Sequence, residues 1–136
     1  MGGRRTAWIA AAVAAGLVTG RKSRVVEHRA RELGIREVHQ GVKDKGRVVG
    51  EILRRRGLAP DQIGFIGDDI VDLPVLLQVG LAVSVPGAPA YVRERVHWVT
   101  ERPGGRGAVR EVCEAVLRAK GLWETATCKY FSPGPL

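Results

Sequence analysis

Short apolar segments alternate with helical patterns between residues 23 and 120, and this alternation limits the fold more than any other feature of the sequence. The apolar segments end at glycine, proline or polar residues, as buried strands do. Between them, apolar residues recur three and four positions apart, which predicts helices. Strands are expected at 35–40, 62–67, 81–85 and 97–100, and helices at 23–33, 46–56, 73–80, 89–96 and 108–120.

This order of elements predicts an α/β fold with three layers, in which a parallel Rossmann-like sheet has helices on both faces. We expect residues 1–120 to form this core and residues 121–136 to form a flexible tail. In such folds the functional site lies at the carboxyl ends of the strands. Three polar clusters occur at those positions: Thr19–Ser23, Gly41–Lys45 and Gly67–Asp72.

The composition excludes some classes of function. The chain has 136 residues, which suits one small domain, and a formal net charge of +8. Its arginines are scattered over the expected helices, so solvated helix faces are favoured over a nucleic-acid surface, and the charge suits a small anionic substrate. The two cysteines, Cys113 and Cys128, form no CxxC pair, which argues against zinc. Cys113 lies on one apolar helical face together with Val109, as core residues would.

The first residues allow two interpretations. Arg4 and Arg5 precede a thirteen-residue apolar run over 6–18, which resembles a secretory signal but is too short to span a membrane. The same run also suits a buried helix or strand of a cytoplasmic domain. The sequence that follows, "TGRKS", is typical of a site loop and not of a cleavage site, which favours the cytoplasm.

Asp68 and Asp69 directly follow an expected strand and its terminal Gly67. Magnesium binds one or two carboxylates together with phosphate oxygens and water, so this strand end could hold it. Asp72 could begin the next helix or orient a neighbouring side chain. The alternative is that all three aspartates only form a turn and a helix cap.

Two other strand ends could supply phosphate ligands. Thr19, followed by Gly20, can donate to a phosphate oxygen from its side chain and its backbone together. Lys45 follows the "GVKD" loop at a helix start and offers a compact positive charge, with Lys43 as a neighbouring candidate and a solvated lysine as the alternative. A hydroxyl, a lysine and a carboxylate pair are what the transfer of a phosphoryl group needs for positioning and charge neutralisation.

Four motifs, "VTGRKS", "HQGVKDK", "IGDDIVDLPVL" and "GGRGAVREVCEAVL", resemble the haloacid dehalogenase superfamily of phosphatases. More narrowly, they resemble 3-deoxy-D-manno-octulosonate 8-phosphate (KDO 8-phosphate) phosphatases. The resemblance implies that Thr19, with Gly20 and Arg21, binds phosphate, that Lys45 and Asp69 act in catalysis, and that Asp68 binds Mg2+. It further implies hydrolysis of KDO 8-phosphate in lipopolysaccharide biosynthesis, by a homotetramer.

The fourth motif contains two further candidate residues. Arg106 and Arg110 could contact the carboxylate of the substrate through the paired donors of their guanidinium groups. The alternative for Arg110 is a solvated position on the last helix of the core.

The chain departs from this family at its beginning. The superfamily's nucleophile is an aspartate in a "DxDG" motif at the tip of the first strand, with a second aspartate as general acid and base. The chain has only five aspartates: Asp44, Asp61, Asp68, Asp69 and Asp72. We therefore expect a phosphatase core truncated at its N-terminus, through a partial gene or a misplaced start, that lacks the first strand and is inactive alone.

Several alternatives remain open from the sequence. Residues 6–18 fit three registers: a helix over Trp8–Ala15 with "LV" as strand, a strand "RTAWI" followed by an insertion, or a strand "VAAGLV". For function, the alternatives are a non-catalytic phosphosugar-binding or regulatory module, an exported protein, and a phosphatase for nine-carbon sialic-type sugar phosphates.

Overall fold

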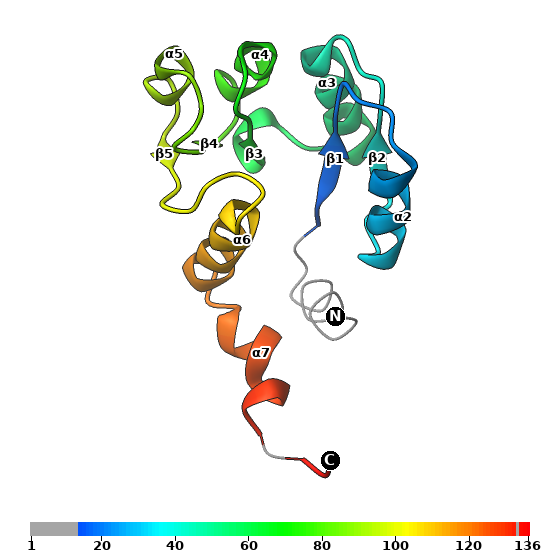
Figure 1. Ribbon diagram of the computed structural model, residues 1–136, viewed down its shortest axis with the longest axis vertical. Helices are drawn as coiled ribbons and strands as arrows, with labels where there is room; N and C mark the ends of the chain where they lie inside the picture. Colours follow the sequence, from blue (N-terminus) through cyan, green and yellow to red (C-terminus); the bar gives the residue numbers. More distant parts are fainter. Residues whose placement is uncertain (1–13, 133) are drawn as a thin grey trace.

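The computed structural model describes residues 14–132 and 134–136 (Figure 1). The strands are β1 (Gly16–Val18), β2 (Glu37–His39), β3 (Gly64–Ile66), β4 (Leu81–Ser84) and β5 (Trp98–Val99). The α-helices are α2 (Arg24–Glu32), α3 (Lys45–Arg56), α4 (Leu73–Leu76), α5 (Ala90–Arg93), α6 (Ala108–Ala119) and α7 (Trp123–Phe131). Two short 3₁₀ turns, η1 (Pro60–Gln62) and η2 (Ile70–Asp72), precede β3 and α4.

The strands pair in parallel, as the sequence predicts, but they form two separate groups. In one group β1 lies beside β2, with Leu17 opposite Val38. In the other, the strand order is β3-β4-β5, with Phe65 opposite Ala82 in the first pair. Within residues 14–132, β1 and β3 do not pair with each other, and no strand pairs with both of them.

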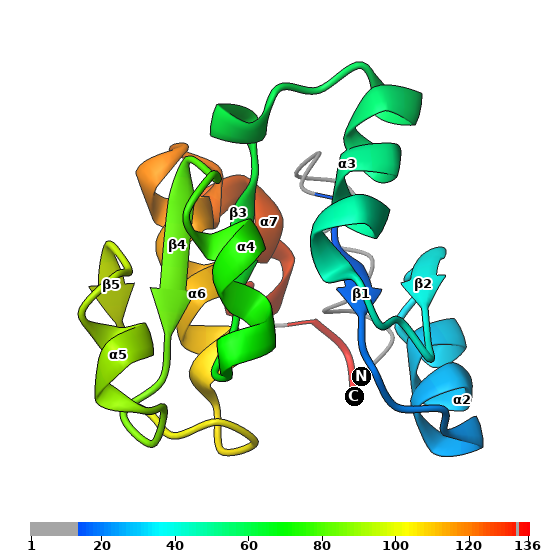
Figure 2. The same ribbon diagram turned by 90° about the horizontal axis from the view of Figure 1, so that it is seen from above.

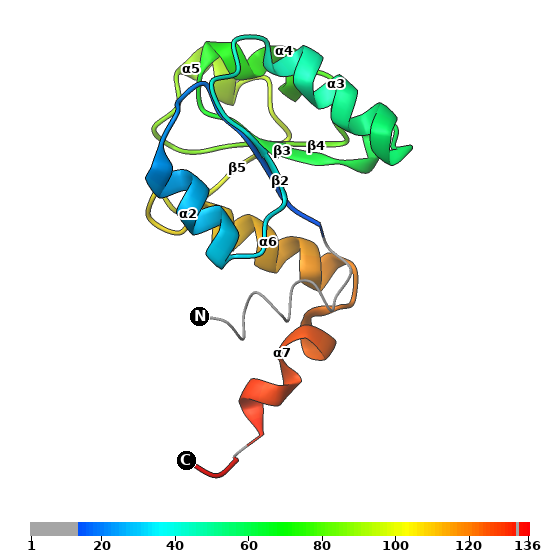
Figure 3. The same ribbon diagram turned by 90° about the vertical axis from the view of Figure 1, so that its right-hand side faces the viewer.

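Helices cover both faces of these strands, which confirms the predicted three-layer arrangement (Figure 3). The helices α3, α4 and α5 lie on one face, and α2 and α6 lie on the other. The core packs beneath the first layer, where Ala82 and Val92 are fully buried and Leu76 is nearly so. No helix in the described part of the chain is long and apolar enough to cross a membrane.

Local sequence signals fix the helix ends next to the site. The Ser23 Oγ accepts a hydrogen bond from the Val26 amide at 3.4 Å and begins α2. The Asp44 Oδ1 accepts one from the Arg47 amide at 3.0 Å and begins α3. Helix α3 ends at Gly57, whose φ of 65° suits a residue without a side chain. As a result, α3 starts with Lys45 at the carboxyl edge of the strands.

Three expectations need correction or stay outside the described residues. Residues 121–136, expected to be a flexible tail, contain helix α7, because Ala126 packs on the buried Leu117 of α6 and Arg118 lies 4.0 Å over the Trp123 ring. Val109, expected on the buried face of its helix, is 61% exposed. The described strand begins at Gly16, and the rest of the three proposed registers falls largely on residues 1–13, outside the described part.

The two cysteines should react at different rates. Burial raises the pKa of the Cys113 thiol to about 11, whereas the side chain of Cys128 is exposed. Because the thiolate is the reactive form, we expect Cys113 to react with a disulfide reagent about a hundredfold more slowly than an ordinary thiol. The Cys128→Ser variant should retain only the slow reaction. If both thiols of the unmodified chain reacted at the same fast rate, this expectation would be contradicted.

Candidate active site

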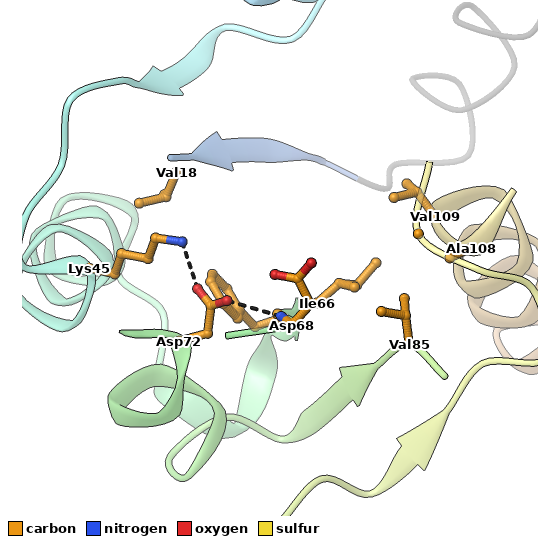
Figure 4. A pocket seen from close by; sticks show the side chains of 11 residues that line it. Val18, Lys45, Ile66, Asp68, Asp72, Val85, Ala108 and Val109 are labelled. Atoms are coloured by element: carbon orange, nitrogen blue, oxygen red, sulfur yellow. Dashed lines mark hydrogen bonds and ion pairs between the residues drawn. The ribbon is translucent and has the colours of Figure 1, made fainter. Parts of the chain in front are cut away.

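A cavity of about 220 Å³ lies between the ends of β1 and β3 (Figure 4). Apolar side chains from different elements form most of its wall: Val18, Phe65, Ile66, Val85, Ala108 and Val109. Lys45, Asp68 and Asp72 line its polar part. The cavity therefore lies where the sequence places the site, at the carboxyl ends of parallel strands.

Asp72 connects the polar residues of this cavity. Its Oδ1 lies 2.7 Å from the Lys45 Nζ, and the two side chains are only 4% and 15% exposed. Its Oδ2 accepts hydrogen bonds from the backbone amides of Asp68 and Asp69, at 3.0 and 3.1 Å. A buried carboxylate needs such partners, and here both of its oxygens are used.

The position of Asp72 depends on Gly67. A Cβ atom at residue 67 would lie 2.5 Å from the Asp72 Cβ, closer than real atoms approach. The glycine that ends β3 therefore lets the Asp72 carboxylate lie under the loop and reach the amides of Asp68 and Asp69. In the sequence, the short spacing of Gly67 and Asp72 is the signal of this contact. Lys45, the ion-pair partner of Asp72, is distant in the sequence.

The carboxylates of Asp68 and Asp69 have different surroundings. The Asp69 Oδ1 accepts a hydrogen bond from the Ile70 amide at 2.7 Å and thereby begins η2, and Asp69 does not line the cavity. Asp68 lines the cavity and its carboxylate points into the space between β3 and β1 (Figure 4). The structure thus gives Asp69 a capping contact, and its expected catalytic role stays a prediction.

The "TGR" segment follows β1 directly and ties it to β2. The Thr19 amide donates to the His39 carbonyl at 2.9 Å, and the Thr19 carbonyl accepts from the Val42 amide at 3.0 Å. The Thr19 Oγ1 accepts from the Arg21 amide at 3.2 Å. Thr19, Gly20 and Arg21 are next to Val18 in the chain but do not themselves line the cavity.

The structure does not bring the two arginines of the fourth motif into the cavity. Arg106 is exposed in the loop before α6. The Arg110 Nε lies 3.0 Å from the Glu114 Oε1, one turn further along α6, in a half-exposed pair. Gly104 and Ala108 of the same motif do line the cavity. The predicted contact of Arg106 and Arg110 with a substrate carboxylate stays a prediction.

Glu111 holds this loop in place, and the sequence reasoning did not select it. Its two carboxylate oxygens accept hydrogen bonds from the backbone amides of Glu101 and Arg102, at 3.0 and 2.9 Å. These bonds lower the pKa of Glu111 below its ordinary value. An acidic residue in the first turn of a helix was the available signal, but its partners come from the preceding loop.

The residues fit a magnesium ion that is shared with a phosphate group. Among the described residues, no three carboxylate, histidine or cysteine side chains gather into a metal cluster. The Asp72 carboxylate is already bonded to Lys45 and to two backbone amides. Asp68 is therefore the carboxylate of the cavity that remains to bind a metal ion. Magnesium commonly binds one or two protein carboxylates and takes its other ligands from phosphate and water, so one carboxylate is compatible with a shared ion.

Comparisons with known proteins identify the family to which the chain is similar. No family model matches the chain. Over 111 residues it is 44% identical to the 3-deoxy-D-manno-octulosonate 8-phosphate phosphatase KdsC of Yersinia pestis, over 82% of this chain and 59% of that protein. The KDO 8-phosphate phosphatase of Moraxella catarrhalis, solved with a magnesium ion, a phosphate ion and KDO, is 33% identical with a TM-score of 0.88, and the match covers 94% of this chain and 73% of that one.

The chain belongs to the KDO 8-phosphate phosphatase family. A probable YrbI family phosphatase from Pseudomonas syringae pv. phaseolica has a TM-score of 0.92 at 40% identity, over 98% of this chain and 76% of that structure. These matches confirm the family and the haloacid dehalogenase-like fold that the motifs predict. The chain spans about three fifths of the length of the curated family members that it matches, 59% in the Yersinia enzyme.

Proposed function

We propose that this chain provides the phosphate- and magnesium-binding part of a KDO 8-phosphate phosphatase site. The observation that supports this most is the cavity that Lys45 and Asp68 share, because these residues come from different strand ends and lie far apart in the sequence. Relatives that carry the name KDO 8-phosphate phosphatase support the substrate, a phosphorylated sugar acid.

Each residue has a physical role in this proposal. The Lys45 ammonium has three donors, of which one points to Asp72, so the others remain for phosphoryl oxygens. Asp72 orients Lys45, and the Thr19 hydroxyl adds a donor at the neighbouring strand end. Asp68 would hold Mg2+, which neutralises phosphate charge when bound. Lys45 and this ion together would make an anionic group stable in a half-apolar cavity.

We further propose that residues 1–136 alone do not complete the reaction. The family mechanism needs an aspartate nucleophile that precedes the "TGRKS" motif, and Asp44 is the first aspartate in the sequence. Phosphate binding without covalent chemistry is then expected, which is also how the alternative, a non-catalytic phosphosugar-binding module, would behave.

An activity assay paired with calorimetry tests both statements. With KDO 8-phosphate and Mg2+, we expect no release of phosphate above that of the Asp68→Ala variant. Titration with inorganic phosphate and Mg2+ should give saturable heat. The Asp68→Ala and Lys45→Met variants should each bind phosphate at least tenfold more weakly, as expected for one lost charge-assisted contact. Phosphate release well above that of the Asp68→Ala variant would contradict the proposal that the chain alone is inactive. The absence of saturable heat would contradict the proposed phosphate site.

A further inference from the structure

Helix α7 has an apolar stripe that continues beyond the helix on which it packs. The members of this stripe are Trp123, Ala126, Tyr130 and Phe131. Their helical spacing puts them on one face. At the start of the stripe, Ala126 is 3% exposed and packs on Leu117 of α6. At its end, Tyr130 and Phe131 are 50% and 75% exposed, so α6 covers the first part of the stripe and the last part faces solvent.

The uncovered end of the stripe is accessible in the part of the chain that the structure describes. Helix α7 extends from α6 in the direction away from the strands (Figures 1 and 3). Figure 2, a view from above, shows α4 on the near side of β3 and α7 on the far side. A partner could therefore approach the end of α7 from the side of the molecule opposite α4.

Cationic side chains accompany the aromatic rings of this helix. The Arg118 guanidinium lies 4.0 Å from the centre of the Trp123 ring, and the Lys129 ammonium lies 5.2 Å from that of the Tyr130 ring. Residues 118–132 contain three cationic residues and one acidic residue. The helix thus combines exposed aromatic side chains with a local excess of positive charge.

A membrane surface suits this arrangement better than a second folded protein. Two aromatic side chains can bury about 300–500 Å² together, whereas a standard protein interface buries roughly 800 Å² per partner. At a membrane surface, aromatic side chains enter the headgroup region while lysine and arginine attract anionic lipids. The net charge of +8 adds to this attraction. Because no described helix could cross a membrane, the contact would be with its surface.

We propose that the end of α7 is a peripheral membrane anchor, in which Tyr130 and Phe131 enter the headgroup region of a bilayer that contains anionic lipids. The Lys129 ammonium, beside the Tyr130 ring, contacts the phosphate groups of these lipids. The anchor goes beyond the proposed function and does not depend on it, because other residues line the phosphate cavity.

Sedimentation of the 136-residue chain with vesicles tests the anchor. One set of vesicles has equal parts of phosphatidylcholine and phosphatidylglycerol, and the other has phosphatidylcholine alone. We expect binding to the mixed vesicles and at least tenfold weaker binding to phosphatidylcholine alone. For the mixed vesicles, the Tyr130→Ser, Phe131→Ser double variant should bind at least tenfold more weakly, and Lys129→Gln about fivefold more weakly.

A matched control makes the same kind of change at two other exposed apolar residues. Val25 in α2 and Leu77 directly after α4 are 77% and 62% exposed. The Val25→Ser, Leu77→Ser double variant should bind the mixed vesicles as the unmodified chain does. Since both double variants change exposed residues, each should keep the circular dichroism spectrum of the unmodified chain.

A second readout distinguishes insertion from general attraction to the arginines of the chain. In the Phe131→Trp variant, lipids brominated in their acyl chains should quench the fluorescence of the added tryptophan. In the Val25→Trp variant they should leave the added fluorescence unchanged. Equal quenching at the two positions, or none at position 131, would contradict insertion of α7.

Three outcomes of the vesicle experiment would overturn the anchor. The first is no binding to the mixed vesicles. The second is equal binding by the Tyr130→Ser, Phe131→Ser variant, because the scattered arginines would then carry the attraction. The third is a dimer in sedimentation velocity that this variant dissociates, without vesicle binding, because a second copy would then cover the stripe.

Discussion

The Asp72→Ala variant is expected to lose about 3–5 kcal/mol of unfolding free energy, as do other proteins in which one partner of a buried ion pair is removed. The Lys45 ammonium, only 15% exposed, would lose its carboxylate partner. The backbone amides of Asp68 and Asp69 would lose their acceptor as well. Chemical denaturation followed by circular dichroism measures the change.

Two control variants separate these contributions. Asp72→Asn keeps an oxygen for the two amides but places an amide group against the ammonium, whereas Lys45→Met removes the ammonium and leaves the carboxylate bonded to the amides. We expect the variant that combines Asp72→Ala with Lys45→Met to be more stable than the sum of the two single losses predicts. The effects of substitutions within one network of contacts are not additive. A fully additive result, or an Asp72→Ala variant as stable as the original chain, would refute the buried pair.

The Gly67→Ala variant is expected to lose about 1–3 kcal/mol, the usual cost of overpacking a filled site. Its new methyl group would lie against the Asp72 Cβ and Cγ, at 2.5 and 2.7 Å, and would push the carboxylate away from its partners. The amide signals of Asp68 and Asp69 in a heteronuclear spectrum should shift, since they report the bonds to Asp72.

Gly87→Ala is the matched control for this substitution. Nothing lies within 4 Å of a Cβ at Gly87, so its stability should stay within about 0.5 kcal/mol of the original chain. Equal stability of the two variants would show that the position of Asp72 does not depend on Gly67.

Local signals were enough to predict the layers and most elements. Ser23, Asp44 and Gly57 mark helix ends by side-chain hydrogen bonds or backbone conformation that depend on near neighbours in the sequence. The run before Gly67 predicts β3, because a buried parallel strand is apolar on both faces. The hydrogen bonds and turns that define these ends join residues close together in the sequence.

Features that depend on distant contacts were missed or misplaced. Helix α7 is stabilised by its packing on Leu117, and the sequence of Trp123–Phe131 has weak helical periodicity of its own. The direction of Arg110 depends on Glu114 and on how the preceding loop lies. The Lys45–Asp72 pair joins residues from different parts of the chain, so the sequence indicated both residues without indicating their contact.

That pair also connects the two groups of strands. Lys45 belongs to the helix that follows β2, and Asp72 belongs to the turn that follows β3. Neither side chain could stay buried as an ion if the other group of strands came away, because a single buried charge is costly. The pair therefore couples the two groups: they should unfold as one thermodynamic unit even though no backbone ladder joins them within the described residues.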